Sequence, residues 1–148
     1  MKSKLQFNDY QVLETYYKYD PDNQLEEETV SPDFNLKIQY LNNEKTEAFL
    51  NLGVRLGDKN LDQNSFYMEA QVLGRFLVVS GDEDLPEGFV ENMFRKNALA
   101  ILYPYMRALV TTLSNNGSEA PIMLPPMNIA EMIESKDKIE ELNFEEDS

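Results

Sequence analysis

The sequence predicts an α+β domain: a four-stranded antiparallel meander sheet, then a long helix interrupted by proline, then a short second helix. Two observations support this prediction. In the first half of the chain, four segments rich in alternating apolar, aromatic or β-branched residues are separated by polar turn-forming residues. In the second half, a long apolar segment with helical spacing leads into glycine and proline. Strands that precede helices, rather than alternate with them, are typical of the α+β class.

The second predicted strand has the most regular pattern, with apolar residues at every even-numbered position from Phe34 to Tyr40. This alternation indicates a sheet with one buried face. The first strand alternates less regularly, and we expect both of its faces to be partly covered. The turn before the third strand begins at Asn42, because asparagine caps its own backbone and tolerates positive φ. The four predicted strands are residues 5–19, 34–40, 48–56 and 66–78.

The long helix is predicted to begin near Asp84 or Leu85 and to stop at Gly117. Pro104 has no amide hydrogen to donate to the carbonyl of Ala100, so we expect a kink or a break near Ala100.

The segment after this helix is predicted to contain the short second helix, with Asn128 as its N-cap and residues 129–133 as its body. Residues 135–148 contain two basic and six acidic residues and few apolar ones. This composition predicts a mobile acidic tail behind a single domain of residues 1–134.

Apolar residues cover more than half of the circumference of the long helix, which is more than one core-facing stripe needs. The chain can cover one side of the helix with its own sheet, and we expect a second copy to cover the other. The sequence therefore predicts a homo-oligomer, at least a dimer. The candidate interface residues are Ile101, Tyr105, Leu109 and Leu113.

The composition excludes several classes of function. The chain of 148 residues has 13 basic and 27 acidic residues, a net charge of −14, and no clustered basic surface for nucleic acid. Because it contains no Cys and no His, it has no thiol nucleophile, no Ser-His-Asp triad and no common structural zinc site. We expect no catalytic residue, no metal site and no cofactor. The sequence has no signal-peptide pattern and no 18-residue apolar run, which predicts a cytoplasmic protein that does not insert into membranes.

Two motifs in the second half resemble those of SecB, the bacterial export chaperone. The sequence Ile-Leu-Tyr-Pro-Tyr-Met-Arg at residues 101–107 is similar to the family's ILFPYAR. Gly117 follows, and Leu-Pro-Pro-Met-Asn-Ile at residues 124–129 stands where the family has LAPVNF. These elements fall in one register without gaps. A shorter match, Phe-Tyr-Met-Glu at residues 66–69, resembles the family's FLCE.

The resemblance implies a SecB-like fold and a holdase-type chaperone for unfolded or partly folded polypeptide, acting in protein export without nucleotide or catalysis. It also implies a dimer or a dimer of dimers. In the family, an acidic residue on the sheet contacts the SecA translocation ATPase, and Tyr67 and Glu69 match that contact. The alternative for Glu69 is a solvated side chain without a partner protein.

The resemblance further implies a polypeptide-binding groove in the segment after the long helix. This segment is rich in methionine, a flexible side chain that adapts to varied ligands. The alternative is that these side chains pack the second helix onto the sheet. The exposed edge of the strand at residues 34–40 could receive a peptide by strand addition, or could be closed by another subunit. The candidate groove residues are Leu36, Ile38, Tyr40, Ile122, Met123, Leu124, Met127, Met132 and Ile133.

Two other functions stay open from the sequence. The chain could be a structural or adaptor protein that keeps the SecB-like fold and recognises one specific partner. An enzyme is the more distant alternative, because the acidic clusters stand where helix capping and solvation explain them.

Overall fold

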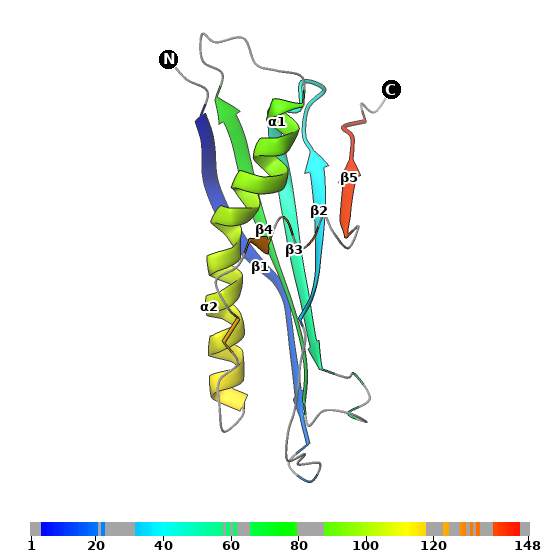
Figure 1. Ribbon diagram of the computed structural model, residues 1–148, viewed down its shortest axis with the longest axis vertical. Helices are drawn as coiled ribbons and strands as arrows, with labels where there is room; N and C mark the ends of the chain where they lie inside the picture. The colour runs from blue at the N-terminus through cyan, green and yellow to red at the C-terminus, as the bar shows by residue number, and fades with distance from the viewer. Residues whose placement is uncertain are drawn as a thin grey trace.

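The computed structural model is one sheet with a long helical stretch packed on one of its faces (Figure 1). The residues it describes are 4–20, 22, 32–57, 59, 61, 66–79, 88–117, 123, 124, 128, 129, 131, 133 and 138–145. The strands are β1 (Lys4–Tyr19), β2 (Asp33–Tyr40), β3 (Glu47–Gly57), β4 (Phe66–Val79) and β5 (Ile139–Leu142). The helical stretch consists of α1 (Phe89–Asn92), η1 (Met93–Ala98) and α2 (Leu99–Gly117).

The sheet order is β1-β4-β3-β2-β5. Strands β2, β3 and β4 form the predicted antiparallel meander, and the α+β class is confirmed. Strand β1, however, pairs with β4 and not with its sequence neighbour β2. The long connection between β1 and β2 makes this possible, because it has to cross only about 14 Å, three times the spacing between neighbouring strands.

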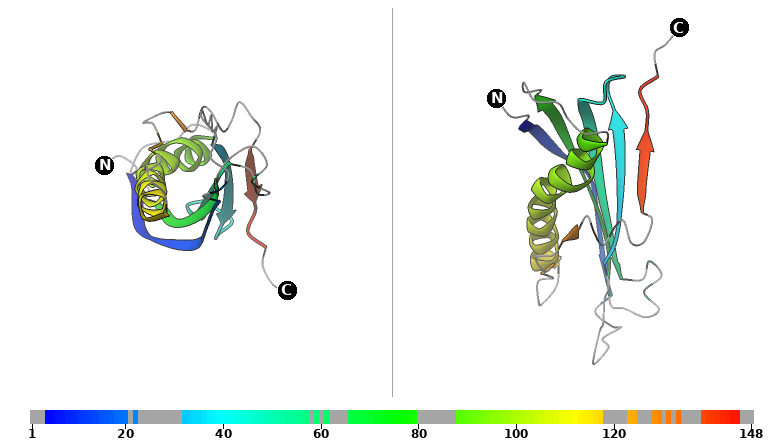
Figure 2. Two further views of the ribbon diagram at one scale, coloured as in Figure 1. Left: turned by 90° about the horizontal axis from the view of Figure 1, so that it is seen from below. Right: turned by 45° about the horizontal axis from the view of Figure 1, so that its top comes forward.

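The helical stretch lies in the concave face of the sheet, and β1 curls around α2 at one side (Figure 2). The alternation read from β2 places its apolar side chains on this face, where each is at most 3 % exposed. The apolar side chains of β3 and β4 join them, together with Phe94, Leu102, Met106 and Val110 from the helix. The core is therefore a single layer between the sheet and the helix.

Two β-bulges explain the irregular pattern of β1. Its register against β4 shifts between Phe7 and Asp9 and again between Val12 and Glu14, so Asn8 and Leu13 have no partner residue. Each extra residue reverses the direction in which the following side chains point. Leu5, Phe7, Tyr17 and Tyr19 pack against the core at the two ends of β1. The middle of the strand is exposed.

The helix does not break at Pro104, which lies inside α2. The irregularity comes earlier, in the π-helical segment η1, where the axis bends (Figure 1). One widened turn changes the helix direction before Ala100, the position where we expected a kink. The described helix begins at Phe89 after Gly88, which has φ 82°; Asp84 and Leu85 lie outside the described residues. The described part of α2 runs to Gly117, the residue predicted as its stop, and residues 118–122 lie outside the described part of the chain.

Part of the segment expected to be a mobile tail is a strand of the sheet. Residues Ile139–Leu142 form β5 and pair in parallel with β2, with Leu36 opposite Ile139. The apolar residues Ile139 and Leu142 are partly buried, which explains why this stretch of an acidic segment can join the sheet. Within the described part of the chain, none of the helices combines the length and the apolar character needed to span a membrane.

The close approach of α2 to β4 depends on Gly74. A Cβ atom at Gly74 would lie 2.7 Å from a ring carbon of Phe76 and 3.1 Å from a methyl carbon of Leu102. We expect Gly74→Ala to lower the free energy of unfolding by about 1–3 kcal/mol, because the core has no room for the added methyl group. Urea unfolding measures the change.

Gly53→Ala is the matched control in the neighbouring strand β3. The three atoms nearest to its added Cβ all belong to the side chain of Asn35, which is exposed and can rotate away. If both variants lost the same stability, the contact between Gly74 and α2 would not be the cause.

Candidate functional site

The segment after α2 is tied to the helix by Arg107. Its Nε donates a hydrogen bond of 2.9 Å to the carbonyl oxygen of Leu124. Leu124 is 3 % exposed and belongs to the core. The neighbouring Met123 is 73 % exposed, the largest value among the exposed large apolar side chains of the described residues. The bond therefore fixes the backbone of this segment while one methionine side chain projects into solvent.

A helical turn follows, as the sequence predicts. The backbone amide of Glu131 donates to Oδ1 of Asn128 at 3.2 Å, and residues 129, 131 and 133 have helical conformation. This is the N-cap predicted for Asn128. Ile129 and Ile133 are 2 % and 1 % exposed and pack into the core. The turn is held to the sheet by these two side chains.

The candidate groove residues divide into three groups. Leu36, Ile38 and Tyr40 are at most 1 % exposed, and Leu124 and Ile133 are also buried. A peptide cannot touch these five side chains in this conformation, because they already fill the layer between sheet and helix. Met123 is open to solvent. The remaining candidates, Ile122, Met127 and Met132, lie outside the described residues.

The edge of β2, considered above for a peptide or a subunit, is occupied by the chain itself. Strand β5 pairs with it from Leu36 to Gln39, and the amide of Leu36 donates to the carbonyl of Lys138 at 2.9 Å. The amide of Lys138 in turn donates to the carbonyl of Ile133 at 3.2 Å. The short helical turn and β5 are thus joined by the backbone.

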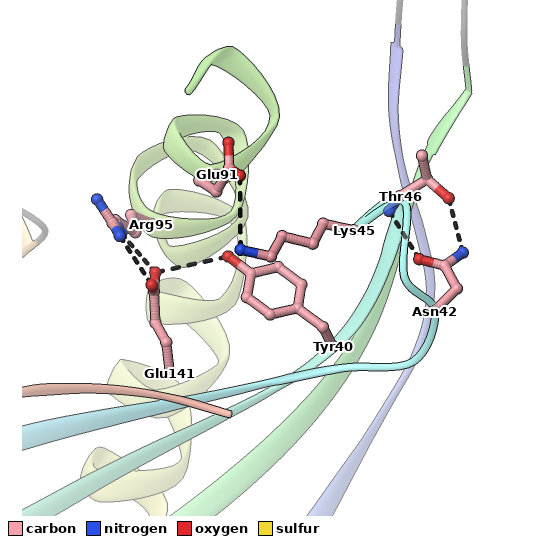
Figure 3. A network of polar contacts seen from close by, with 7 residues as sticks. All are labelled: Tyr40, Asn42, Lys45, Thr46, Glu91, Arg95 and Glu141. Atoms are coloured by element: carbon pink, nitrogen blue, oxygen red, sulfur yellow. Dashed lines mark hydrogen bonds and ion pairs between the residues drawn. The ribbon is translucent and has the colours of Figure 1, made fainter. Parts of the chain in front are cut away.

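A polar network fastens β5 to the helix (Figure 3). Arg95 forms a bidentate pair with Glu141. Its Nε donates to Oε1 at 2.5 Å and its Nη2 donates to Oε2 at 2.8 Å. The Tyr40 hydroxyl donates to Oε1 of the same carboxylate at 3.5 Å. Lys45 lies 3.8 Å from Glu91 and 5.1 Å above the Tyr40 ring. Bidentate pairing of this kind fixes geometry as well as adding energy.

The network shifts two pKa values in opposite directions. Hydrogen bonds from Arg95 hold the pKa of the Glu141 carboxyl below its usual range, and partial burial opposes this effect. Burial, followed by the charge of Glu141, raises the pKa of the Tyr40 phenol above its usual range. At neutral pH, Tyr40 therefore keeps its proton and Glu141 is ionised, the states in which one donates and the other accepts.

The candidate interface residues of α2 lie beside an exposed apolar stretch of β1. Ile101 and Tyr105 are 36 % and 38 % exposed, while Leu109 and Leu113 are partly buried against the core. The Tyr105 ring lies 4.4 Å from that of Tyr10. The apolar assembly surface, as we name it, consists of Tyr10, Val12, Ile101 and Tyr105, each 36–47 % exposed. Tyr16 is exposed on the opposite face of β1, where it contacts Tyr67.

The residues matched to the SecA contact are less accessible than expected. Tyr67 is 5 % exposed and lies 5.9 Å from the ring of Tyr16. Glu69 is ion-paired with Arg55 on the neighbouring strand, with Nε and Oε1 3.1 Å apart. A partner protein would have to compete with Arg55 for this carboxylate.

The described residues contain no group of three or more Asp, Glu, His or Cys side chains that could hold a metal ion. Two ion pairs lie on the sheet surface, Arg55 with Glu69 and Arg75 with Glu47.

The motifs at residues 101–107 and 124–129, which the bond between Arg107 and Leu124 joins, both lie within a match to a known protein family. The family model described as "Preprotein translocase subunit SecB" matches residues 18–140. This chain belongs to the SecB family. The Protein-export protein SecB of Pseudomonas savastanoi pv. phaseolicola is 32 % identical over 100 residues, which are 68 % of this chain and 58 % of the relative.

Two further relatives extend the comparison. The "Uncharacterized protein MJ0357" of Methanocaldococcus jannaschii is 32 % identical over 110 residues, 74 % of this chain and 68 % of that protein. Among solved structures, the SecB-like chaperone Rv1957 of Mycobacterium tuberculosis, in complex with a ChAD peptide from the Rv1956 HigA1 antitoxin, has a TM-score of 0.63 at 19 % identity. The match covers 83 % of this chain and 90 % of that one, and shows a shared SecB fold.

The sequence did not lead us to β5 or to the contact between Glu141 and Arg95. Ile139 and Leu142 were the available signal, as apolar residues within an acidic segment. No feature of the sequence indicated a contact for Arg95, because a basic residue on a helix is ordinarily solvated. Only the fold shows that residues 95 and 141 meet.

We expect the attachment of β5 to weaken in acid. Since the folded pKa of Glu141 is lowered, its contribution to stability is complete above the unfolded pKa and is lost as pH falls below about 4.5. Hydrogen exchange at the Leu36 amide, which donates to β5, measures this loss. Glu141→Gln should remove the pH dependence and cost about 1 kcal/mol of protection at neutral pH.

Glu140→Gln provides the control for net charge. Glu140 is the adjacent residue of β5, but it is exposed and its neighbour across the strand pair is Lys37. If Glu140→Gln reduced protection as much as Glu141→Gln, general charge and not the pair with Arg95 would hold β5.

Proposed function

We propose that this SecB protein is a holdase-type chaperone that binds unfolded or partly folded polypeptide as a homo-oligomer. Family membership supports the proposal, and so does the peptide complex named for the Mycobacterium chaperone. The observation in this chain that carries it is the bond between Arg107 and Leu124, which fixes the segment after α2 and leaves Met123 exposed. Binding would act by mass action, lowering the concentration of free unfolded chain.

The name of the Pseudomonas relative extends the proposal to protein export from the cytoplasm. A contact with SecA through Tyr67 and Glu69 would require the sheet surface to rearrange, since Tyr67 is buried and Glu69 is paired with Arg55.

A second candidate function is the recognition of one defined partner segment. It is favoured because few of the candidate groove residues are accessible. Leu36, Ile38 and Tyr40 are buried, and β5 covers the edge of β2. A site with little free apolar surface selects its ligand more narrowly than an open one.

Suppression of aggregation separates these candidates. A chemically unfolded, unrelated protein is diluted into buffer with this chain in several-fold excess, and light scattering is followed. We expect the native chain to suppress scattering and Met123→Glu to weaken client binding by about tenfold, which corresponds to about 1.4 kcal/mol. A charge at this exposed position opposes the burial of apolar client side chains.

Phe89→Glu is the matched control, because Phe89 is also an exposed large apolar residue but belongs to α1, at the other end of the helical stretch. Equal losses in both variants would mean that Met123 has no special part. No suppression by the native chain would rule out general chaperoning and leave the defined-partner function.

The assembly surface has its own test. We expect Ile101→Glu to weaken self-association by about tenfold or more, because a charge buried at an interface costs several kcal/mol. Sedimentation velocity over a range of concentrations measures the effect. Asn92→Glu, at an exposed polar position of α1, should assemble like the native chain. A native chain that stayed monomeric at high concentration would overturn the assembly.

A further inference from the structure

Strand β5 is held less extensively than any other strand of the sheet. It contributes four residues, pairs with β2 alone, and lies at the end of the described strand order. Its pairing is parallel, which is slightly less stable per residue than antiparallel pairing. By contrast, β1 pairs with β4 along nearly all of its 16 residues. Of the two edges of the sheet, the one at β5 is therefore the easier to open.

The contacts of β5 form a pattern that another chain could reproduce. Ile139 packs against the core, and two residues later Glu141 binds Arg95 and receives the hydroxyl of Tyr40. Successive side chains of a strand point to opposite faces, so Ile139 and Glu141 share the face toward the helix. Glu140, between them, is exposed. A segment that took the place of β5 would thus need an apolar residue and, two positions later, a carboxylate.

Backbone groups of β2 supply the rest of the contact. The Leu36 amide donates to the carbonyl of Lys138, a bond that any extended segment can accept. The surface beside the other end of the pair is hollowed. It is lined by Gln39, Tyr40 and Leu41 on the side of β2 and by Glu141, Leu142, Asn143, Phe144 and Glu145 on the side of β5. Phe144 is 36 % exposed here. A segment that displaced β5 and extended beyond it would meet Gln39, Tyr40 and Leu41 at this end.

We propose that the β2 edge is a binding site for an extended polypeptide segment with an apolar residue and, two residues later, an acidic one, and that β5 is its built-in competitor. The proposal rests on the proposed polypeptide-binding function and names the ligand class and the control of that site. Arg95 selects the acid, and the core beside Leu36 accepts the apolar residue. Displacement of β5 exposes both.

Tethering gives β5 a large advantage. A segment on a short linker competes with an effective concentration of about 1 mM, so a free peptide of equal affinity at about 10 µM would occupy only about one site in a hundred. A client therefore gains access by exceeding the affinity of β5 or by meeting a chain in which β5 is already weakened.

The first experiment weakens β5 in the full chain. A free peptide of residues 138–143, Lys-Ile-Glu-Glu-Leu-Asn, is titrated into the native, Glu141→Gln and Glu140→Gln proteins and followed by NMR. We expect Glu141→Gln to bind this peptide about tenfold more tightly than the native chain and Glu140→Gln does, because the charge-assisted bond of the competitor is lost. A peptide with glutamine in place of the second glutamate should lose this gain. Equal binding by all three proteins, or equal binding of both peptides, overturns the proposal.

The second experiment locks β5 in place. Lys37 and Glu140 are opposite each other across the strand pair and both are exposed, and the chain has no cysteine of its own. Lys37→Cys with Glu140→Cys should form one disulfide within the chain when oxidised. We expect the oxidised form to bind no peptide and the reduced form to bind it. Peptide binding by the oxidised form, or a disulfide that forms between two chains, overturns the proposal.

The same locked protein separates this inference from the function on which it rests. Suppression of aggregation that falls on oxidation and returns on reduction supports the β2 edge as the client site. Suppression that is equal in both states leaves the chaperone function standing and overturns the inference. If neither state suppresses aggregation, the chaperone function fails, and the peptide titration alone decides whether the edge is a binding site.

Discussion

The packing of one helical stretch into a curled sheet is the contact on which the rest of this SecB structure depends. It buries the inward side chains of β2, β3 and β4 in a single layer, and Gly74 provides the space in which α2 approaches β4. The same helix carries Arg107 and Arg95, which reach out of the core to opposite ends of the C-terminal segment. Without the helix in this place, neither the segment after α2 nor β5 would have its attachment.

Local patterns in the sequence predicted the core of the fold well. The even-numbered apolar residues of β2 are buried, and Asn128 caps a helical turn. These features depend on neighbours in the chain, so periodicity and capping rules reveal them. The two motifs that indicated SecB also have a local physical meaning, because the arginine of one donates to the backbone of the other.

Features that depend on distant residues were harder to predict. The pairing of β1 with β4 follows from long-range packing, and the bulges at Asn8 and Leu13 leave no simple signal in composition. The candidate site was hard to predict for the same reason. The strand residues proposed to line a groove are apolar because they form the core, and the polar anchor between residues 95 and 141 joins parts of the chain that no spacing rule connects.

The π-helical turn lets one continuous helical stretch contact both sides of the sheet. Phe89 to Gly117 runs without a gap through α1, η1 and α2. Within the widened turn, Phe94 packs on Tyr40 of β2 and Arg95 binds Glu141 of β5. After it, Tyr105 packs on Tyr10 of β1. The proposed subunit surface at β1 and the proposed binding site at the β2 edge are therefore joined by one continuous helical stretch.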